Sequence, residues 1–283
     1  MFEKRKPDFE YIYKVTDGVG LPMRVYMPKT KKDKHRAVLC IHGGGWKGAI
    51  KDNSSWDGSW MSNHAQYYAD NGYVGISISY RDLDLSENTF TKDQIDDCRD
   101  ALIFIKDKLS FVDFETLSVI GDSAGGHLAL CLGFLEDENL RPYKISAFNP
   151  VTDLTVEKWA YTGKNSDERK SISPLYMIDS FNENSRKPEI LCMHGDNDKT
   201  VPIEDTVNFE KKLKQKGFES QMVVVKDASH AFILWGYTAP DELVYECMKI
   251  SDKFLFEEYI KFEKNTVIIF PIRNTNIFRM FTF

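Results

Sequence analysis

The sequence lacks both a long uninterrupted apolar run and an excess of charge of one sign. Its 283 residues hold 37 lysines and arginines against 43 aspartates and glutamates, scattered along the chain, for a formal net charge of -6. A nucleic-acid surface needs a concentrated basic face, which this pattern does not supply. Pro271, Arg273 and Arg279 interrupt the apolar stretch at 265–283, so it falls short of the roughly 20 apolar residues of a spanning helix. We expect no nucleic-acid partner and no membrane span.

Cysteine is also sparse. The five cysteines are far apart and form no CxxC pair, which argues against a disulfide framework and a cysteine-based zinc site. No HExxH pattern occurs either, so we expect neither a metal nor another cofactor. The charged N-terminal residues are followed by no apolar core of signal-peptide length. Together with thiols that we expect to be buried and reduced, this predicts a cytoplasmic protein.

What the sequence does contain is an alternation of short buried runs and helical patterns. Strands are expected at 21–27, 37–41, 73–79, 117–120, 145–148, 189–193 and 221–225, and helices at 61–71, 92–109, 124–135, 203–216 and 240–262. This alternation predicts an α/β fold, with a mostly parallel central sheet covered by helices on both faces.

The chain is expected to form one domain at 1–264, followed by a tail at 265–283. A long polar connection at about 150–187 breaks the alternation and predicts a small lid insertion; a surface excursion is the alternative. The tail could add a strand, pack on a partner subunit, as in a homodimer, or be a disordered appendage.

The strongest chemical signal is the segment GDSAG at 121–125, between a buried strand and a helical pattern. The glycines two before and two after Ser123 remove side chains that would clash in the strained turn of a nucleophile elbow. Ser123 is therefore the candidate nucleophile. The backbone N–H of Ala124, at the start of the helix, is a candidate donor to a developing oxyanion.

A second signal is the segment HGGGW at 42–46, at the end of an expected strand. Consecutive glycines let backbone N–H groups face a substrate oxygen without obstruction. Gly43 and Gly44 are predicted to join Ala124 in an oxyanion hole; an ordinary glycine-rich turn is the alternative.

A serine hydroxyl needs a base to take its proton, and six histidines are available. His230 follows the expected strand at 221–225, late in the chain, and is the candidate base. Position assigns the other five elsewhere: His35 and His64 to the surface, His42 and His194 to the bracing of loops, and His127 to a helix that leads away from the site.

The acid that orients the base should follow the expected strand at 189–193, where Asp196 and Asp198 compete. Either could hold the imidazole tautomer and stabilise its charged form, and spacing alone does not choose between them. Asp122, beside the nucleophile, is expected to be structural.

The segments GDSAGGHLAL at 121–130, HGGGW at 42–46, SYRD at 79–82 and HGDNDKTVP at 194–202 resemble the α/β-hydrolase superfamily. More narrowly, the chain resembles the bacterial esterase and lipase group of hormone-sensitive-lipase-like enzymes and relatives of feruloyl and acetyl-xylan esterases. In that family the pattern HGxxDxxVP supplies the acid at its fifth position, so the resemblance implies a triad of Ser123, His230 and Asp198. It covers roughly residues 20–262 and has no counterpart to the tail.

The resemblance implies hydrolysis of carboxylic esters with a short acyl group, such as acetyl or aryl esters, through an acyl-enzyme. Kynurenine formamidases share an HGGxW pattern, so arylformamide cleavage is the alternative chemistry. A binding role without catalysis, as in the gibberellin receptors of the same fold, is a third hypothesis, which the intact serine, histidine and aspartate disfavour. Trp46, Trp159 and Trp235 are candidate walls of the substrate pocket or, equally, core residues.

Overall fold

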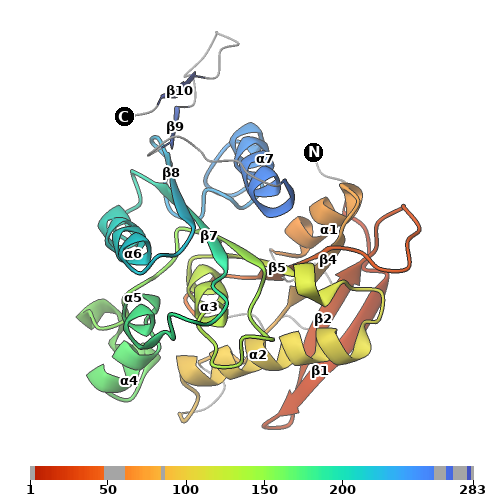
Figure 1. Cartoon of the computed structure of the whole chain (residues 1–283), viewed down its shortest axis with the longest axis horizontal. Coiled ribbons are helices and arrows are strands. Elements are labelled where there is room, and N and C mark those ends of the chain that lie inside the picture. Colours follow the sequence, from red (N-terminus) through yellow and green to blue (C-terminus); the bar gives the residue numbers. More distant parts are fainter. Residues whose placement is uncertain (1–3, 48–60, 84–86, 258–265, 270–278, 282–283) are drawn as a thin grey trace.

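Strands and helices alternate along most of the chain (Figure 1). The computed structural model describes residues 4–47, 61–83, 87–257, 266–269 and 279–281. The strands are β1 (Phe9–Thr16), β2 (Val19–Tyr26), β3 (Ala37–Ile41), β4 (Val74–Ile78), β5 (Ser118–Asp122), β6 (Lys144–Phe148), β7 (Glu189–Gly195), β8 (Ser220–Val225), β9 (Thr266–Ile269) and β10 (Arg279–Phe281). The helices are α1 (Ser62–Asp70), α2 (Thr91–Lys108), α3 (Ala124–Leu132), α4 (Ser166–Ser171), α5 (Pro174–Met177), α6 (Ile203–Gln215) and α7 (Asp241–Phe256), with 3-10 turns η1 (Phe114–Thr116), η2 (Glu157–Thr162) and η3 (Ile178–Ser180).

The strands form one sheet in the order β1-β2-β4-β3-β5-β6-β7-β8-β9-β10. From β4 through β9 every neighbouring pair is parallel, whereas β1, β2 and β10 run antiparallel to their neighbours. Strands β3 to β6 are buried along their whole length, as expected of parallel strands with helices on both faces. The predicted fold class is confirmed.

Two apolar clusters cover the two faces of the sheet. One packs α2, α3 and α6 against side chains such as Leu39 and Ile41 of β3, and the other packs α1 and α7 against Val38 and Cys40 of the same strand. The alternation along β3 therefore divides the core into two layers. All five cysteines are buried within these layers: Cys40, Cys98, Cys131, Cys192 and Cys247.

The expected helix at 240–262 ends earlier than predicted, at Phe256, and Glu257 is already extended. Arg36 donates hydrogen bonds to the carbonyl oxygens of Leu255 and Phe256, at 2.9 and 3.0 Å. These carbonyls have no partner within the helix, so a guanidinium that satisfies both stabilises its end there. Residues 258–265 lie outside the described part of the chain.

The segment at 150–187, predicted as a lid, carries η2, α4, α5 and η3. Leu154, Ile172 and Ile178 are buried in the α3 side of the core. Arg169 fastens the segment internally through the carbonyl oxygens of Leu154 and Ala160. The segment is thus packed on the sheet domain, and its role as a lid stays a prediction.

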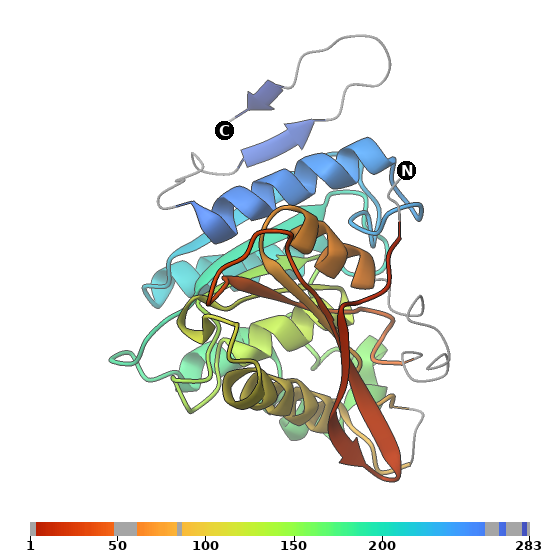
Figure 2. The same ribbon diagram turned by 90° about the vertical axis from the view of Figure 1, so that its right-hand side faces the viewer.

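The tail contributes two strands to the sheet. Residues 223–225 of β8 pair in parallel with 266–268 of β9, and β10 pairs antiparallel with β9. Figure 2 shows this pair at the outer edge of the molecule, next to α7. Of the three alternatives left open by the sequence, the structure has the added strand.

Candidate active site

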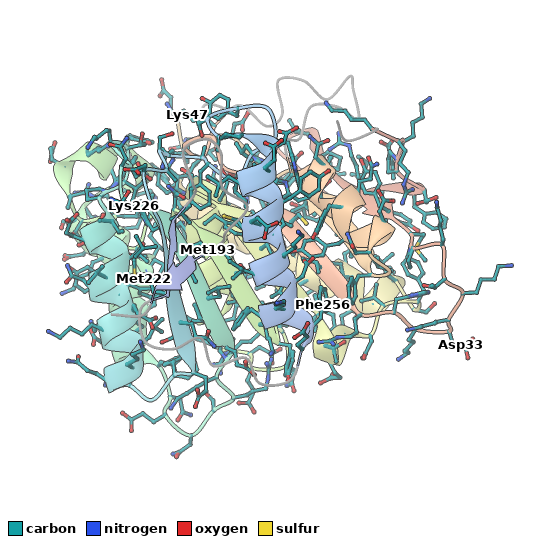
Figure 3. All side chains as sticks on the ribbon, turned by 90° about the horizontal axis from the view of Figure 1, so that it is seen from above. Asp33, Lys47, Met193, Met222, Lys226 and Phe256 are labelled. Atoms are coloured by element: carbon teal, nitrogen blue, oxygen red, sulfur yellow. The ribbon has the colours of Figure 1, made fainter. Side chains whose placement is uncertain are left out.

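The candidate residues all follow strands of the parallel sheet: Ser123 follows β5, Asp198 follows β7 and His230 follows β8. Parallel strands direct their carboxyl ends to one edge, so these loops converge. In Figure 3 that edge is at the top, where Lys47 and Lys226 follow β3 and β8, while Asp33, which precedes β3, lies toward the opposite edge.

Ser123 lies on a strained turn between β5 and α3. Its backbone has φ 52° and ψ -119°, and its N–H donates to the carbonyl oxygen of Phe148 at 2.8 Å. Side chains at Gly121 or Gly125 would overlap backbone atoms, of Gly125 in the first case and of Ile41 in the second. The glycines around the serine are therefore required by close backbone approach, and this geometry is that of a nucleophile elbow.

Ser123, His230 and Asp198 form a continuous hydrogen-bonded chain. Nε2 of His230 lies 2.8 Å from Oγ of Ser123, and Nδ1 lies 2.6 Å from Oδ2 of Asp198. An ionised carboxylate can only accept, so Nδ1 carries the proton and the lone pair of Nε2 faces the serine hydroxyl. This tautomer can take the serine proton.

Asp198 is held ionised by its surroundings. Burial opposes its charge, but hydrogen bonds from His194, His230, the Val201 amide and Asn149 outweigh that cost and hold its pKa well below the usual value. Its Oδ1 accepts the N–H groups of Thr200 and Val201 at 2.7 and 2.9 Å, and its Oδ2 accepts Nδ2 of Asn149 at 2.5 Å. A carboxylate fixed in this way can stabilise an imidazolium.

The structure also separates the two competing aspartates. Asp196 accepts the N–H of Asp227 at 2.6 Å and lies 3.5 Å from the ammonium of Lys226, so it stabilises the turn after β8. His194 braces its own loop, with its nitrogens 2.8 Å from Oγ1 of Thr206 and 3.0 Å from the carbonyl oxygen of Val201.

The prediction that Gly43 donates to an oxyanion is wrong for this structure. Its N–H already donates to Oδ1 of Asp122 at 3.0 Å, and a side chain at this position would meet the Asp122 carboxylate. Among the described residues, no acceptor pairs with the N–H groups of Gly44, Gly45 or Ala124. Gly44 and Ala124 remain candidate oxyanion donors, and the structure adds Gly45, which the sequence analysis did not name.

Asp122 has the structural role that the sequence predicts, because it ties the glycine loop to the nucleophile elbow. Burial raises the pKa of its carboxyl to about 6, although the hydrogen bond from Gly43 and the nearby His230 favour the charged form. The neighbouring His42 stacks on Tyr80, with ring centroids 4.3 Å apart, and Tyr80 Oη donates to the His42 carbonyl oxygen at 2.8 Å. The start of the loop is thus held on both sides.

The tryptophans have different surroundings. Trp46 has no exposed surface, and its ring packs edge-on against His127 and Trp159, so the prediction that it lines an open pocket is wrong: it supports the glycine loop from inside. Trp159 is 6% exposed, and Trp235 packs against His64 and Tyr67 of α1. Substrate contact by Trp159 and Trp235 stays a prediction.

Sequence reasoning placed two histidines wrongly and missed two residues at the site. His35 and His64 are buried, not at the surface, and His64 Nε2 lies 3.2 Å from the carbonyl oxygen of Ile233, in the loop after His230. Asn149, directly after β6, contacts Asp198, and Tyr161 projects its hydroxyl near Gly45. The signal for Asn149 was its place: an Asn-Pro pair at the end of a central strand.

Among the described residues, no three His, Cys, Asp or Glu side chains are grouped so that they could hold a metal ion. Likewise, no helix in the described ranges has the length and apolar character needed to cross a membrane.

Several known proteins with similar sequences and folds are hydrolases. The BD-FAE family model matches residues 23–159 and the dienelactone hydrolase family model matches residues 177–242. Ethyl acetate hydrolase of Pseudomonas putida is 26% identical over 248 residues, which cover 78% of this chain and 74% of that enzyme. Arylacetamide deacetylase of Bos taurus is 32% identical over 143 residues, but these make up only 34% of that enzyme.

Solved structures of esterase 2 from Thermogutta terrifontis have a similar fold over most of the chain. The propionate-bound form has a TM-score of 0.74 at 26% identity, covering 88% of this chain and 93% of that one. The strand order, the elbow and these similarities define an α/β-hydrolase. Within that class, the chain is esterase/lipase-like.

Proposed function

We propose that the protein hydrolyses carboxylic esters with short acyl groups through a covalent acyl-enzyme on Ser123. The observation that carries the proposal is the Ser123–His230–Asp198 chain, with 2.8 and 2.6 Å between its members. The acyl size rests on similarity: the relatives include an ethyl acetate hydrolase and an esterase with propionate or butyrate bound.

In the first half-reaction Oγ of Ser123 attacks the ester carbonyl carbon while Nε2 of His230 takes the hydroxyl proton. The carbonyl oxygen becomes an oxyanion. We assign its stabilisation to the N–H groups of Gly44, Gly45 and Ala124, with Gly45 in place of the occupied Gly43. The bond to the leaving oxygen then breaks, and His230 gives its proton to the departing alcohol.

In the second half-reaction water attacks the acyl carbon and His230 takes a proton from the water. Collapse of the second tetrahedral intermediate breaks the bond to Ser123, returns a proton to Oγ and releases the carboxylic acid. Asp198 stays ionised throughout and stabilises the imidazolium in both steps.

The hydrogen-bonded triad disfavours a role in binding alone, since a base already faces the candidate nucleophile.

All five thiols are buried, which supports the prediction of a reducing, cytoplasmic environment. A homodimer stays a prediction.

Steady-state hydrolysis of p-nitrophenyl acetate, butyrate and octanoate, beside N-formylkynurenine, tests the function. We expect preference for the two short esters, and a loss of roughly a millionfold in kcat for Ser123→Ala with the fold intact. A fluorophosphonate probe should label the wild type and not the variant. Preference for N-formylkynurenine would replace the proposal with arylformamide cleavage. Absence of both turnover and labelling would leave the binding role.

A further inference from the structure

A buried histidine outside the triad links the glycine loop to the nucleophile helix. His127 lies one helical turn after Ser123, and its N–H donates to the Ser123 carbonyl oxygen at 3.0 Å. The imidazole ring of His127 contacts Trp46: Nε1 of Trp46 lies 3.3 Å from Nδ1 of His127, and the two rings pack edge-on with centroids 5.5 Å apart. Both side chains have no exposed surface.

The contacts fix the protonation state of this imidazole. An indole N–H can only donate, so Nδ1 of His127 is an unprotonated acceptor. Its Nε2 lies 2.8 Å from the carbonyl oxygen of Ile172, which can only accept, so Nε2 carries the proton. Burial lowers the pKa of His127 to about 4, which is consistent with a neutral ring across the physiological range.

The contact with Ile172 extends the link to the segment at 150–187. Sγ of Cys131, on the next turn of α3, also lies 3.4 Å from the Ile172 carbonyl oxygen. One imidazole therefore joins three parts of the site: the glycine loop through Trp46, the helix that begins at Ser123, and the segment packed beside them.

The glycine loop requires such support. Gly44, Gly45 and Trp46 have φ values of 100°, 64° and 62°, and a left-handed conformation is costly for a tryptophan. The Trp46 carbonyl oxygen accepts hydrogen bonds from the Leu83 N–H and from Nε2 of Gln94, at 3.0 and 2.8 Å. The indole of Trp46 is tied to α3 by its hydrogen bond to His127. Beside the contact between Gly43 and Asp122, this side chain is therefore a second link that fixes the glycine amides relative to Ser123.

We propose that His127 is a positioning residue for the oxyanion loop, which it holds in register with Ser123 by accepting the indole N–H of Trp46. The inference rests on the proposed ester hydrolysis. It assigns to a neutral histidine, which neither touches substrate nor titrates in the reaction, a share of transition-state stabilisation.

Two substitutions separate the two ends of the imidazole. In His127→Gln the amide nitrogen can reach the position of Nε2, so the donor to Ile172 is kept and the acceptor for Trp46 is lost. In His127→Asn the amide oxygen occupies the place of Nδ1, so the acceptor for Trp46 is kept and the donor to Ile172 is lost. Trp46→Phe removes the same hydrogen bond from the other partner while retaining an aromatic ring.

Each variant is assayed on p-nitrophenyl butyrate, with active sites counted by fluorophosphonate titration and folding checked by thermal denaturation. We expect kcat per active site to fall about ten- to a hundredfold in His127→Gln and in Trp46→Phe, with KM within twofold, since misplaced donors weaken the transition state selectively. The double variant His127→Gln/Trp46→Phe should lose no more kcat than either single variant, because both remove the same hydrogen bond. His127→Asn should retain most of the wild-type activity. Cys131→Ala is the control for disturbance near Ile172.

A transition-state analogue supplies a readout that a purely structural role would not move. Affinity for a trifluoromethyl ketone should fall in His127→Gln by the same factor as kcat/KM. Equal per-site kcat in His127→Gln and wild type, or an equal loss in His127→Asn and His127→Gln, would overturn the proposal. A wild-type protein that neither turns over esters nor reacts with the probe would instead overturn the proposed function.

Discussion

Asn149 donates a hydrogen bond to the same carboxylate oxygen of Asp198, Oδ2, that accepts Nδ1 of His230. Asn149 has φ 44° and no exposed surface, a backbone conformation that asparagine tolerates better than most residues. The residue after β6 therefore positions Asp198, the proposed acid, which follows β7, and strand neighbours in the sheet become neighbours in the site.

The hydrogen bond from Asn149 is expected to support turnover. Asn149→Gly keeps a residue suited to positive φ and removes only the side chain. A hydrogen bond to a charged group is worth about 1.5–3 kcal/mol, so we expect kcat/KM to fall roughly ten- to a hundredfold. Asn149→Asp, of the same size, brings a second carboxylate to Asp198 and should cost more. Steady-state kinetics on p-nitrophenyl butyrate decide this, and wild-type rates in Asn149→Asp would contradict it.

The two aspartates of the loop after β7 should differ sharply in function. Asp198→Asn cannot hold the same imidazole tautomer, so we expect a loss of roughly 10⁴ in kcat. Asp196→Asn is the matched control, because Asp196 contacts the turn at Lys226 and Asp227, and its rate should stay within a few-fold of wild type. Equal effects of the two substitutions would refute the assignment of the acid.

Asp122 should couple pH to activity. Burial raises its pKa to about 6, so the carboxylate that accepts the Gly43 N–H is charged above that pH and neutral below it. Asp122→Asn keeps an acceptor for Gly43 without the charge. We expect the ratio of wild-type to variant kcat/KM to rise as pH increases through about 6, since the charge stabilises both the loop and the His230 imidazolium. A ratio of wild-type to variant kcat/KM that stays constant from pH 5 to pH 8 would contradict this prediction.

Asp252 of α7 should couple pH to stability instead. Burial raises its pKa to about 7, despite the hydrogen bond that it accepts from Tyr67 at 2.5 Å. The pKa of an unfolded aspartate is about 3.9. Between these values the native state retains a proton that the unfolded state has lost, so stability falls as pH rises through the window from about 4 to about 7 and stays low above it.

In Asp252→Asn the fall of stability with rising pH should be absent. Relative to wild type, the urea midpoint of the variant should be higher at pH 8 and nearly unchanged at pH 4.5. Tyr67 can still donate to the amide oxygen of the variant. Asp70→Asn, at the end of α1 where the Asp70 side chain is 44% exposed, is the control and should leave the pH dependence unchanged. Equal midpoint shifts of Asp252→Asn at both pH values would contradict a raised pKa.

The central strands and the elbow could be predicted because their signals are local. Buried parallel strands such as β3 read as continuous apolar runs, and a serine flanked by spaced glycines between strand and helix has few other uses. By contrast, β1 was missed because it is an edge strand: Phe9, Ile12 and Val15 are exposed, and only Tyr13 is buried. Its place depends on pairing with β2, which no pattern within the strand encodes.

The wrong assignments at the site have a common cause, which is partner choice across long sequence separations. The glycines of the loop at 42–46 are evident in the sequence, but only the fold shows that the Gly43 N–H donates to Asp122. His64 was placed at the surface by its polar neighbours, yet the loop after His230 covers it. Spacing identified a loop with two candidate acids, and the hydrogen bond to His230 distinguishes them.

The burial of every cysteine gives the protein a property useful at the bench. Burial raises the pKa of the thiols of Cys40, Cys98 and Cys192 well above the ordinary value, and that of Cys247 to about 12. A thiol that is neither exposed nor ionised reacts slowly with alkylating reagents. Thiol alkylation therefore reports opening of the fold, while fluorophosphonate labelling reports the competence of Ser123. Because Cys40 and Cys98 lie on opposite faces of the sheet, the rates at these two sites would reveal which layer comes apart first.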